Sequence, residues 1–351
     1  MKEYPSAQLK PGMITALPVL TASGQIVIHE NVILTSQLIM RLGFYNIKSA
    51  TVLDLDPKAE LSYSQQVKKS PQFQKFQLDF TFKTKDIQQS FEDIINGRVI
   101  STDTLLSQVT SLFHEKQTTI DFFDMIHNFR INDDTIYAHS VNVALISRVI
   151  GLWLKLPKEE IDTLTLAGLL HDIGKTKIPE DILNKKEKLT DSEYTLIKKH
   201  PQFGFDILRK QKQLDIRIIK TALMHHERCD GSGYPLKLTA KDIEPFARII
   251  SIADVYDAMT AARAYRSPLC PFEVISEFET DGLQKYDPQY ILTFLEHIAT
   301  TYQNNRVMLS NGESAKIVLL NHQIFSKPLV ELNDHSCIDL SKSDLFIKAI
   351  I

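Results

Sequence analysis

Two short runs of histidine and acidic residues are the parts of this 351-residue chain best suited to chemistry. HDIGK spans residues 171–175, and HHERCDGSGYP spans residues 225–235. Neighbouring side chains on a helix point about 100° apart, so a pair such as His171 and Asp172 reaches different atoms instead of stacking on one face. Adjacent ligands of this kind suit two neighbouring cations.

The surrounding sequence adds further ligand-capable residues in or beside expected helices. Five histidines and two aspartates are too many for one closed zinc site. Two ions about 3.5 to 4 Å apart lower the pKa of a shared water and clamp a phosphodiester for in-line attack. The sequence therefore predicts a two-metal centre formed by His139, His171, Asp172, His200, His225, His226 and Asp254.

The type of ligand narrows the choice of metal. Histidine nitrogens and carboxylate oxygens without thiolates favour iron or manganese, although ligand type alone leaves zinc and nickel open. Lys175 follows His171 by one expected helical turn, where an ammonium would neutralise a phosphate oxygen beside the metals. Isolated histidines are more often ordinary core or surface residues, and we interpret six in that way: His29, His114, His127, His297, His322 and His335.

Composition is that of a folded globular protein, with 43% hydrophobic residues. The 40 Lys and Arg against 43 Asp and Glu give a net charge of −3, so the excess basic charge that binds nucleic-acid polymers is absent. No stretch approaches the roughly 20 apolar residues of a membrane helix. Three widely separated cysteines fit a reducing compartment: Cys229, Cys270 and Cys337. We expect a cytoplasmic protein with neither a membrane nor a nucleic-acid partner.

Hydrophobic periodicity divides the chain into four parts. Residues 1–56 are predicted to form a small β-rich module with a short helix near residues 35–42, and the polar stretch 57–83 a linker. Residues 84–303 have helical spacing, and residues 304–351 are predicted to be strands. Thr190 and Glu193 form an expected capping box, Pro201 marks a break or restart, and Asn311-Gly312 predicts a hairpin turn.

Several motifs, in order, resemble one protein family. HDIGK, the helix around His139, KKHPQFGFDIL, HHERCDGSGYP and ARIISIADVYDAMTAARAYR together resemble the HD-GYP domain, a bacterial branch of the HD metal-dependent phosphohydrolases. The flanking runs LKPGM, VMLSNGESAKIVLLN and PLVEL are similar to modules that bracket such domains. The resemblance implies a mainly α fold, a helical HD-GYP bundle with a small N-terminal β-rich module and a C-terminal β-hairpin extension.

The resemblance also implies an activity, hydrolysis of cyclic di-GMP by a metal-bridging hydroxide. This bacterial second messenger controls motility and biofilm formation, and the products are pGpG and, in some members, GMP. Asp172 would bridge the two ions. One ion would be held by His139, His171 and Asp254, and the other by His200, His225 and His226.

Substrate contacts follow from the same resemblance. Lys175 would be a catalytic group that contacts phosphate, and Arg263, Tyr265 and Arg266 match an RxYR-type segment that meets phosphate and guanine. Solvated charge at a helix end is the alternative for the two arginines. The GSGYP loop would shape the active-site rim and dock a partner such as a diguanylate cyclase (GGDEF) domain, although the same residues are strong turn formers.

Two positions depart from the family pattern. Thr135 stands where some members have a glutamate that helps hold a third metal, so we predict two ions and leave conversion to GMP open. Ala264 stands where proline is frequent, which predicts a less rigid loop. Two other functions stay open: hydrolysis of another cyclic dinucleotide such as 3′,3′-cyclic GMP-AMP, and a catalytically silent cyclic di-GMP sensor or protein-interaction module.

Overall fold

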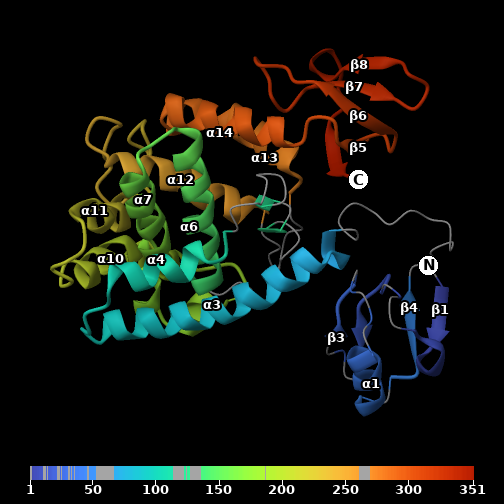
Figure 1. Cartoon of the computed structure of the whole chain (residues 1–351), viewed down its shortest axis with the longest axis horizontal. Helices are drawn as coiled ribbons and strands as arrows, with labels where there is room; N and C mark the ends of the chain where they lie inside the picture. Colours follow the sequence, from blue (N-terminus) through green and yellow to red (C-terminus); the bar gives the residue numbers. More distant parts are fainter. Residues whose placement is uncertain are drawn as a thin grey trace. The chain divides into compact units, whose positions relative to one another are not determined.

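The computed structural model of the chain contains two compact units, residues 1–61 and residues 62–351 (Figure 1). We describe each unit by itself. The structure describes all residues except 1, 11–12, 14, 22–23, 25, 31, 33, 35, 46, 53–66, 114–121, 124, 127–135, 186 and 261–268.

The N-terminal unit is the small β-rich module expected from the sequence. Strand β1 (Lys2–Pro5) pairs antiparallel with β4 (Ser49–Val52), and β2 (Val19–Leu20) pairs antiparallel with β3 (Ile26–Ile28). A short 3-10 helix, η1 (Ser6–Gln8), follows β1, and helix α1 (Ser36–Phe44) precedes β4. The buried apolar core consists of Leu9, Val19, Ile28, Leu34, Leu42, Ala50 and Val52.

Helix α3 (Pro71–Ile95) occupies much of the stretch that we predicted to be a linker. Ser70 caps it by accepting a hydrogen bond from the Phe73 amide, and Pro71 fits the first turn, where no amide donor is needed. Phe73, Phe76 and Phe80 are buried at helical spacing on one face. The linker prediction is wrong for residues 71–83 because polar composition was given more weight than the spacing of these phenylalanines.

The second unit is mainly helical and has α6 near its centre, where it packs against α7, α12, α14, α3 and α4 (Figure 1). A 3-10 helix, η2 (Ile173–Lys177), follows α7 and packs on α10. The remaining helices of the described residues are α4 (Thr102–Thr110), α6 (Ile136–Trp153), α7 (Lys158–Leu170), α8 (Glu180–Leu183), α9 (Asp191–Ile197), α10 (His200–Leu208), α11 (Ile216–Met224), α12 (Pro245–Thr260), α13 (Pro271–Lys285), α14 (Pro288–Thr301) and a further 3-10 helix, η3 (Leu340–Lys342).

Two predicted features of these helices are confirmed. Thr190 accepts a hydrogen bond from the Glu193 amide, and the Glu193 carboxylate accepts one from the Thr190 amide, so the capping box is complete. The chain then restarts at α10, with Pro201 in its first turn.

Helix α6 is the one helix among the described residues with the length and apolar character of a membrane span. It has 18 residues, and 56% of them are buried inside the protein. A core helix passes the same test, so α6 is weak evidence for a membrane.

The chain ends in a five-stranded antiparallel sheet of order β8-β7-β6-β5-β9. Its turn at Asn311-Gly312 is confirmed, with Gly312 at a φ of +89° that favours glycine. The expected hairpin and two further strands are present, and one more strand was not predicted. The strands are β5 (Arg306–Leu309), β6 (Ser314–Leu319), β7 (Leu329–Leu332), β8 (Cys337–Asp339) and β9 (Ile347–Ile350).

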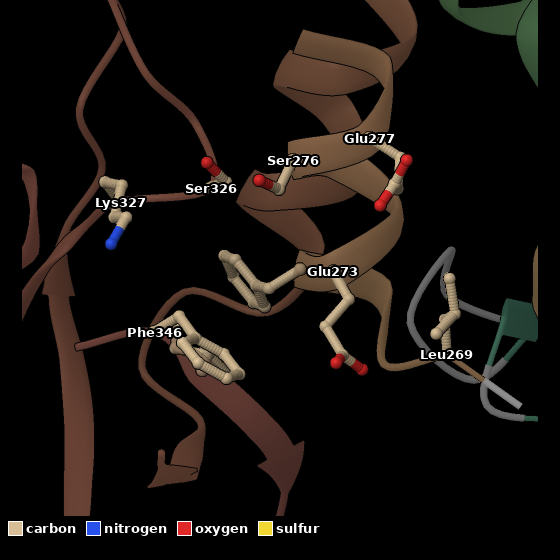
Figure 2. A pocket seen from close by; sticks show the side chains of 9 residues that line it. Leu269, Glu273, Ser276, Glu277, Ser326, Lys327 and Phe346 are labelled. Atoms are coloured by element: carbon tan, nitrogen blue, oxygen red, sulfur yellow. The ribbon is translucent and has the colours of Figure 1, made fainter. Parts of the chain in front are cut away.

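The sheet is attached to α13 by a partly buried carboxylate. Glu279 accepts hydrogen bonds from the amide and hydroxyl of Ser326, the latter at 2.5 Å. Lys327 donates to the Leu345 carbonyl at 2.6 Å, which holds the next loop of the same extension. A pocket of about 220 Å³ lies beside this contact. Figure 2 shows part of its lining, with Ser326 and Phe346 on the extension and Ser276 on α13. The extension is therefore packed on the helical unit.

Candidate metal centre

Three of the candidate ligands lie at helix ends. His171 is the C-cap of α7, His225 is the C-cap of α11, and His200 is the first residue of α10. The free carbonyls at a helix C-terminus carry partial negative charge, which favours a cation near the ends of α7 and α11. We expected HDIGK to lie in one continuous helix, but α7 ends at Leu170 and the 3-10 helix η2 follows Asp172.

The candidate ligands form two groups, each with its ligand atoms within 4.8 Å of one another. All seven residues chosen from the sequence are included, although each group draws on segments far apart in the chain. His139 and Asp254 come from within α6 and α12 and the others from helix ends. The first group is Asp172, His200, His225 and His226, and the second is His139, His171 and Asp254.

Backbone carbonyls set the orientation of three imidazoles. The Nδ1 atoms of His171, His200 and His225 lie 2.7, 2.7 and 3.0 Å from the carbonyl oxygens of Gly168, Ile197 and Ala222. A carbonyl only accepts, so each Nδ1 carries the proton and each Nε2 keeps a lone pair. This tautomer is the one that presents Nε2 to a metal.

The buried donor atoms fit a bound cation. The Nε2 atoms of His200 and His225 face one another at 3.2 Å, and with both protons on Nδ1 these atoms are two acceptors in contact. Nε2 of His171 and Oδ1 of Asp172 are buried and accept no hydrogen bond, whereas Oδ2 of Asp172 is paired with the Lys175 ammonium. Lone pairs gathered in a buried space repel one another unless a positive charge lies among them. The residues present therefore fit a divalent metal ion.

Asp172 lies between the two groups. Its Oδ1 is 3.1 Å from His200 Nε2, and its Oδ2 is 3.4 Å from the Nε2 atoms of both His139 and His171. Burial alone would raise the pKa of Asp172, but Lys175, with Nζ 2.5 Å from Oδ2, and the neighbouring histidines hold that pKa well below its ordinary value. The carboxylate is thus ionised and faces both groups of nitrogens.

Asp257 is a partner of this centre that we did not predict from the sequence. Its Oδ2 lies 2.8 Å from His139 Nδ1, which leaves Nε2 of His139 directed at Asp254 Oδ1, 3.1 Å away. Burial lowers the pKa of His139, but Asp172, Asp254 and Asp257 outweigh it and raise that pKa well above 6.5. A carboxylate behind a ligand histidine fixes its tautomer and strengthens its basicity.

We expect metal affinity to rise with pH, by about tenfold per unit above pH 6.5 until the raised pKa of His139 is reached. The metal must displace the proton that His139 carries below its raised pKa. His225 adds no slope in this range because burial lowers its pKa to about 4. Chelator competition at several pH values measures the slope. In Asp257→Asn the rise of metal affinity with pH should stop at a lower pH, and the affinity itself should fall about 10- to 100-fold. A metal affinity of the wild-type protein that does not change with pH contradicts the prediction.

Glu227 holds the GSGYP loop against the histidine pair, a role that we also did not predict. This side chain is 2% exposed, and its carboxylate accepts hydrogen bonds from the amides of Leu236 at 2.6 Å and Leu238 at 2.9 Å. The Tyr234 ring then stacks on His226, with centroids 4.7 Å apart. A Cβ at Gly233 would meet the Arg228 amide at 2.4 Å, so the loop packs too closely there for another residue.

Glu227→Ala should lower the free energy of unfolding by about 3 kcal/mol, because two amides lose a charged acceptor worth roughly 1.5 to 3 kcal/mol each and solvent replaces part of it. Urea unfolding measures the change. Glu273→Ala is a comparison of the same type: Glu273 accepts one amide bond at the start of α13. We expect that variant to lose about 1 kcal/mol. Equal losses in the two variants would contradict the assigned role of Glu227.

Some predicted residues lie outside the described part of the chain: Thr135, Arg263, Ala264, Tyr265 and Arg266. The two-ion count, the phosphate and guanine contacts and the looser loop inferred from them stay predictions. The phosphate contact of Lys175 is likewise a prediction, although the structure places its ammonium on Asp172.

Comparisons with known proteins agree with this geometry. Residues 102–290 match the HD domain family. The chain is 37% identical over 194 residues to the cyclic di-GMP phosphodiesterase PA4108 of Pseudomonas aeruginosa, covering 55% of this chain and 46% of that protein. It is 37% identical over 161 residues to 3′3′-cGAMP-specific phosphodiesterase 2 of Vibrio cholerae, covering 46% and 31%. The chain thus spans less than half of the length of either relative.

A solved structure supports the fold. Bd1817 of Bdellovibrio bacteriovorus, described as an HDG"Y"P protein, superposes with a TM-score of 0.53 at 17% identity, covering 85% of this chain and 99% of that one. The fold class inferred from the motifs is confirmed, and the two groups of histidine and aspartate are consistent with the binuclear metal site of HD domains. The chain therefore belongs to the HD domain family.

Proposed function

We propose that the chain is a metal-dependent phosphodiesterase that hydrolyses cyclic di-GMP to pGpG in bacterial second-messenger signalling. One observation carries the proposal: seven ligand-capable side chains converge in two adjoining groups, in which buried lone pairs of His171 Nε2 and Asp172 Oδ1 accept no hydrogen bond. Phosphodiester hydrolysis is the reaction that two such ions assist best. The activities for which the relatives from Pseudomonas and Vibrio are named support a cyclic dinucleotide as substrate.

Each part of the site has a proposed role. Two divalent ions, iron or manganese by ligand type, would supply Lewis-acid polarisation of the phosphate and acidify water. Asp172 joins the two groups of nitrogens, and Asp257 holds the tautomer of His139. Lys175 would neutralise a phosphate oxygen, since its ammonium already lies beside Asp172. Tyr234, stacked on His226, forms part of the rim.

The identity of the base is a separate question from the chemistry. The metals would bind phosphate, whereas the surrounding wall would contact the base, so 3′,3′-cyclic GMP-AMP is the second candidate substrate. A relative specific for 3′3′-cGAMP has the same sequence identity to this chain, 37%, as the cyclic di-GMP phosphodiesterase. Side-by-side turnover of both dinucleotides by iron-loaded and manganese-loaded protein tests the proposal. We expect pGpG to form faster than the cGAMP product. The reverse order would reassign the substrate.

A catalytically silent sensor is the alternative from another class of function. It would bind metal and cyclic di-GMP without cleaving it under reducing conditions, so turnover and binding assays on the same metal-loaded sample separate the two. A GGDEF-domain partner at the GSGYP loop is compatible with either function. Ser232, Pro235 and Leu236 of this loop are exposed and open to such contact.

A further inference from the structure

A line of aromatic rings and one lysine leads from the metal centre to the surface. The Tyr234 ring stacks on His226 with an interplanar angle of 25°. The ammonium of Lys198 lies 5.0 Å from the Tyr234 centroid and 4.7 Å from that of Tyr194, within cation–π range of both rings. Tyr194 lies four residues before Lys198, one turn earlier on α9, and is 51% exposed. The line therefore ends in an accessible aromatic face.

Among the described residues, no carboxylate pairs with the ammonium of Lys198. Lys185, which lies near the same helix, pairs with Glu193 at 2.7 Å, and Arg209 on α10 pairs with Asp206 at 3.1 Å. Lys198 makes no ion pair within the described part of the chain, and its side chain is partly buried. A cation that is held between aromatic rings and partly removed from water is stabilised by an anionic ligand. Lys198 lies beside Tyr234 at the rim of the metal centre, so a substrate bound at that centre is the anionic ligand that we expect it to contact.

A cyclic dinucleotide supplies the matching groups. It carries two phosphates and two bases, and the two ions hold only the phosphate that is being cleaved. The second phosphate then needs a cation other than the metals, and an exposed ring beside that cation offers a base a stacking partner. Lys175 lies at Asp172, in the midst of the metal ligands, so it is placed for the first phosphate.

We propose that Lys198 binds the second phosphate of the cyclic dinucleotide and that Tyr194 stacks on the adjoining base. The inference rests on the proposed function and adds a second binding subsite to it. This subsite sets affinity for a dinucleotide over a simple phosphodiester, and it takes no part in the cleavage itself.

The test compares two substrates on the metal-loaded full chain: cyclic di-GMP, with two phosphates, and bis(p-nitrophenyl) phosphate, with one. Lys198→Met keeps the length of the side chain and removes its charge. We expect its KM for cyclic di-GMP to rise about 10- to 100-fold, with kcat and metal content unchanged. KM for bis(p-nitrophenyl) phosphate should stay at the wild-type value. Lys198→Arg should restore most of the affinity for the dinucleotide.

Lys199→Met is the matched control. Lys199 is the next residue, is exposed, and its side chain makes no cap hydrogen bond, so the same charge is removed without touching the rings. We expect its KM to stay within about twofold of wild type. Tyr194→Leu should raise KM for the dinucleotide about tenfold, whereas Tyr194→Phe keeps the ring and the affinity.

Each outcome separates the subsite from the proposed function. Equal KM changes for both substrates, or equal effects of Lys198→Met and Lys199→Met, overturn the subsite alone. Wild-type protein that cleaves bis(p-nitrophenyl) phosphate but neither cyclic dinucleotide overturns the proposed function and the subsite with it. Should Lys198→Met melt at lower temperature, Lys198→Gln provides a second neutral variant for the same comparison.

Discussion

Asp172→Asn is expected to reduce the bound metal from the proposed two ions per chain to one or none and to lower the proposed phosphodiester turnover by about 10³-fold or more. The amide keeps the shape of the carboxylate but removes the charge that faces His139, His171 and His200. Ions that act together supply several kcal/mol of transition-state stabilisation, and each 1.4 kcal/mol or so corresponds to tenfold in rate. Elemental analysis and turnover of the same sample measure both quantities.

Asp162→Asn is the control for this change. Asp162 lies on α7, the helix that ends just before Asp172, and forms an ion pair with Arg148 at 2.7 Å. The loss there should stay near 1 kcal/mol of folding stability, with full metal content. If Asp172→Asn retained two ions and normal turnover, the role assigned to Asp172 between the two metals would be contradicted.

Gly174→Ala is expected to have the largest structural effect of any single methyl group near the centre. An added Cβ would lie 2.0 Å from the His200 carbonyl oxygen and 2.4 Å from the Gly204 amide, and both are backbone atoms. Helix α10 must then move away from η2, which carries His200 away from Asp172. We expect a loss of about 3 kcal/mol in the free energy of unfolding, at the upper end of overpacking effects, together with weaker metal binding.

Gly204→Ala tests the same interface from the opposite side. Its added Cβ would lie 3.5 Å from the Ala222 Cβ, an ordinary contact, and alanine favours a helix by about 1 kcal/mol over glycine. We expect that variant to be as stable as wild type or more stable, with unchanged metal content. Thermal melts and metal titrations of Gly174→Ala and Gly204→Ala measure the stability and the metal binding of each variant. Similar melting temperatures for the two variants would contradict the tight crossing at Gly174.

The sequence predicted seven residues that the structure brings together in two groups, because the chemistry of histidine and aspartate is visible in residue type. His171 beside Asp172 and His225 beside His226 could be chosen without coordinates, because they occur together with further histidines and aspartates in a series of motifs. Asp257 was missed although it lies three residues after Asp254, on the same side of α12. Only the packing of α6 on α12 shows that it reaches His139.

Glu227 and α3 show two further limits of prediction from sequence. Glu227 looks like a surface residue in a polar run, and its burial depends on a loop that folds back nine and eleven residues later. The signal for α3 was present in the spacing of Phe73, Phe76 and Phe80, but the polar residues between them suggested a linker. Local composition identifies neither a loop that closes on itself nor a long helix with one buried stripe.

The position of ligands at the ends of packed helices has a consequence for how the metals enter the protein. In small zinc domains the metal supplies the folding energy, because the unfolded chain must close loops to bring ligands together. Here the bundle closes those loops through its own apolar core, and backbone carbonyls orient His171, His200 and His225. The ions would enter a preorganised binding site, so their affinity depends on how the helices pack. A core substitution far from the metals then changes metal binding whenever it moves a helix end.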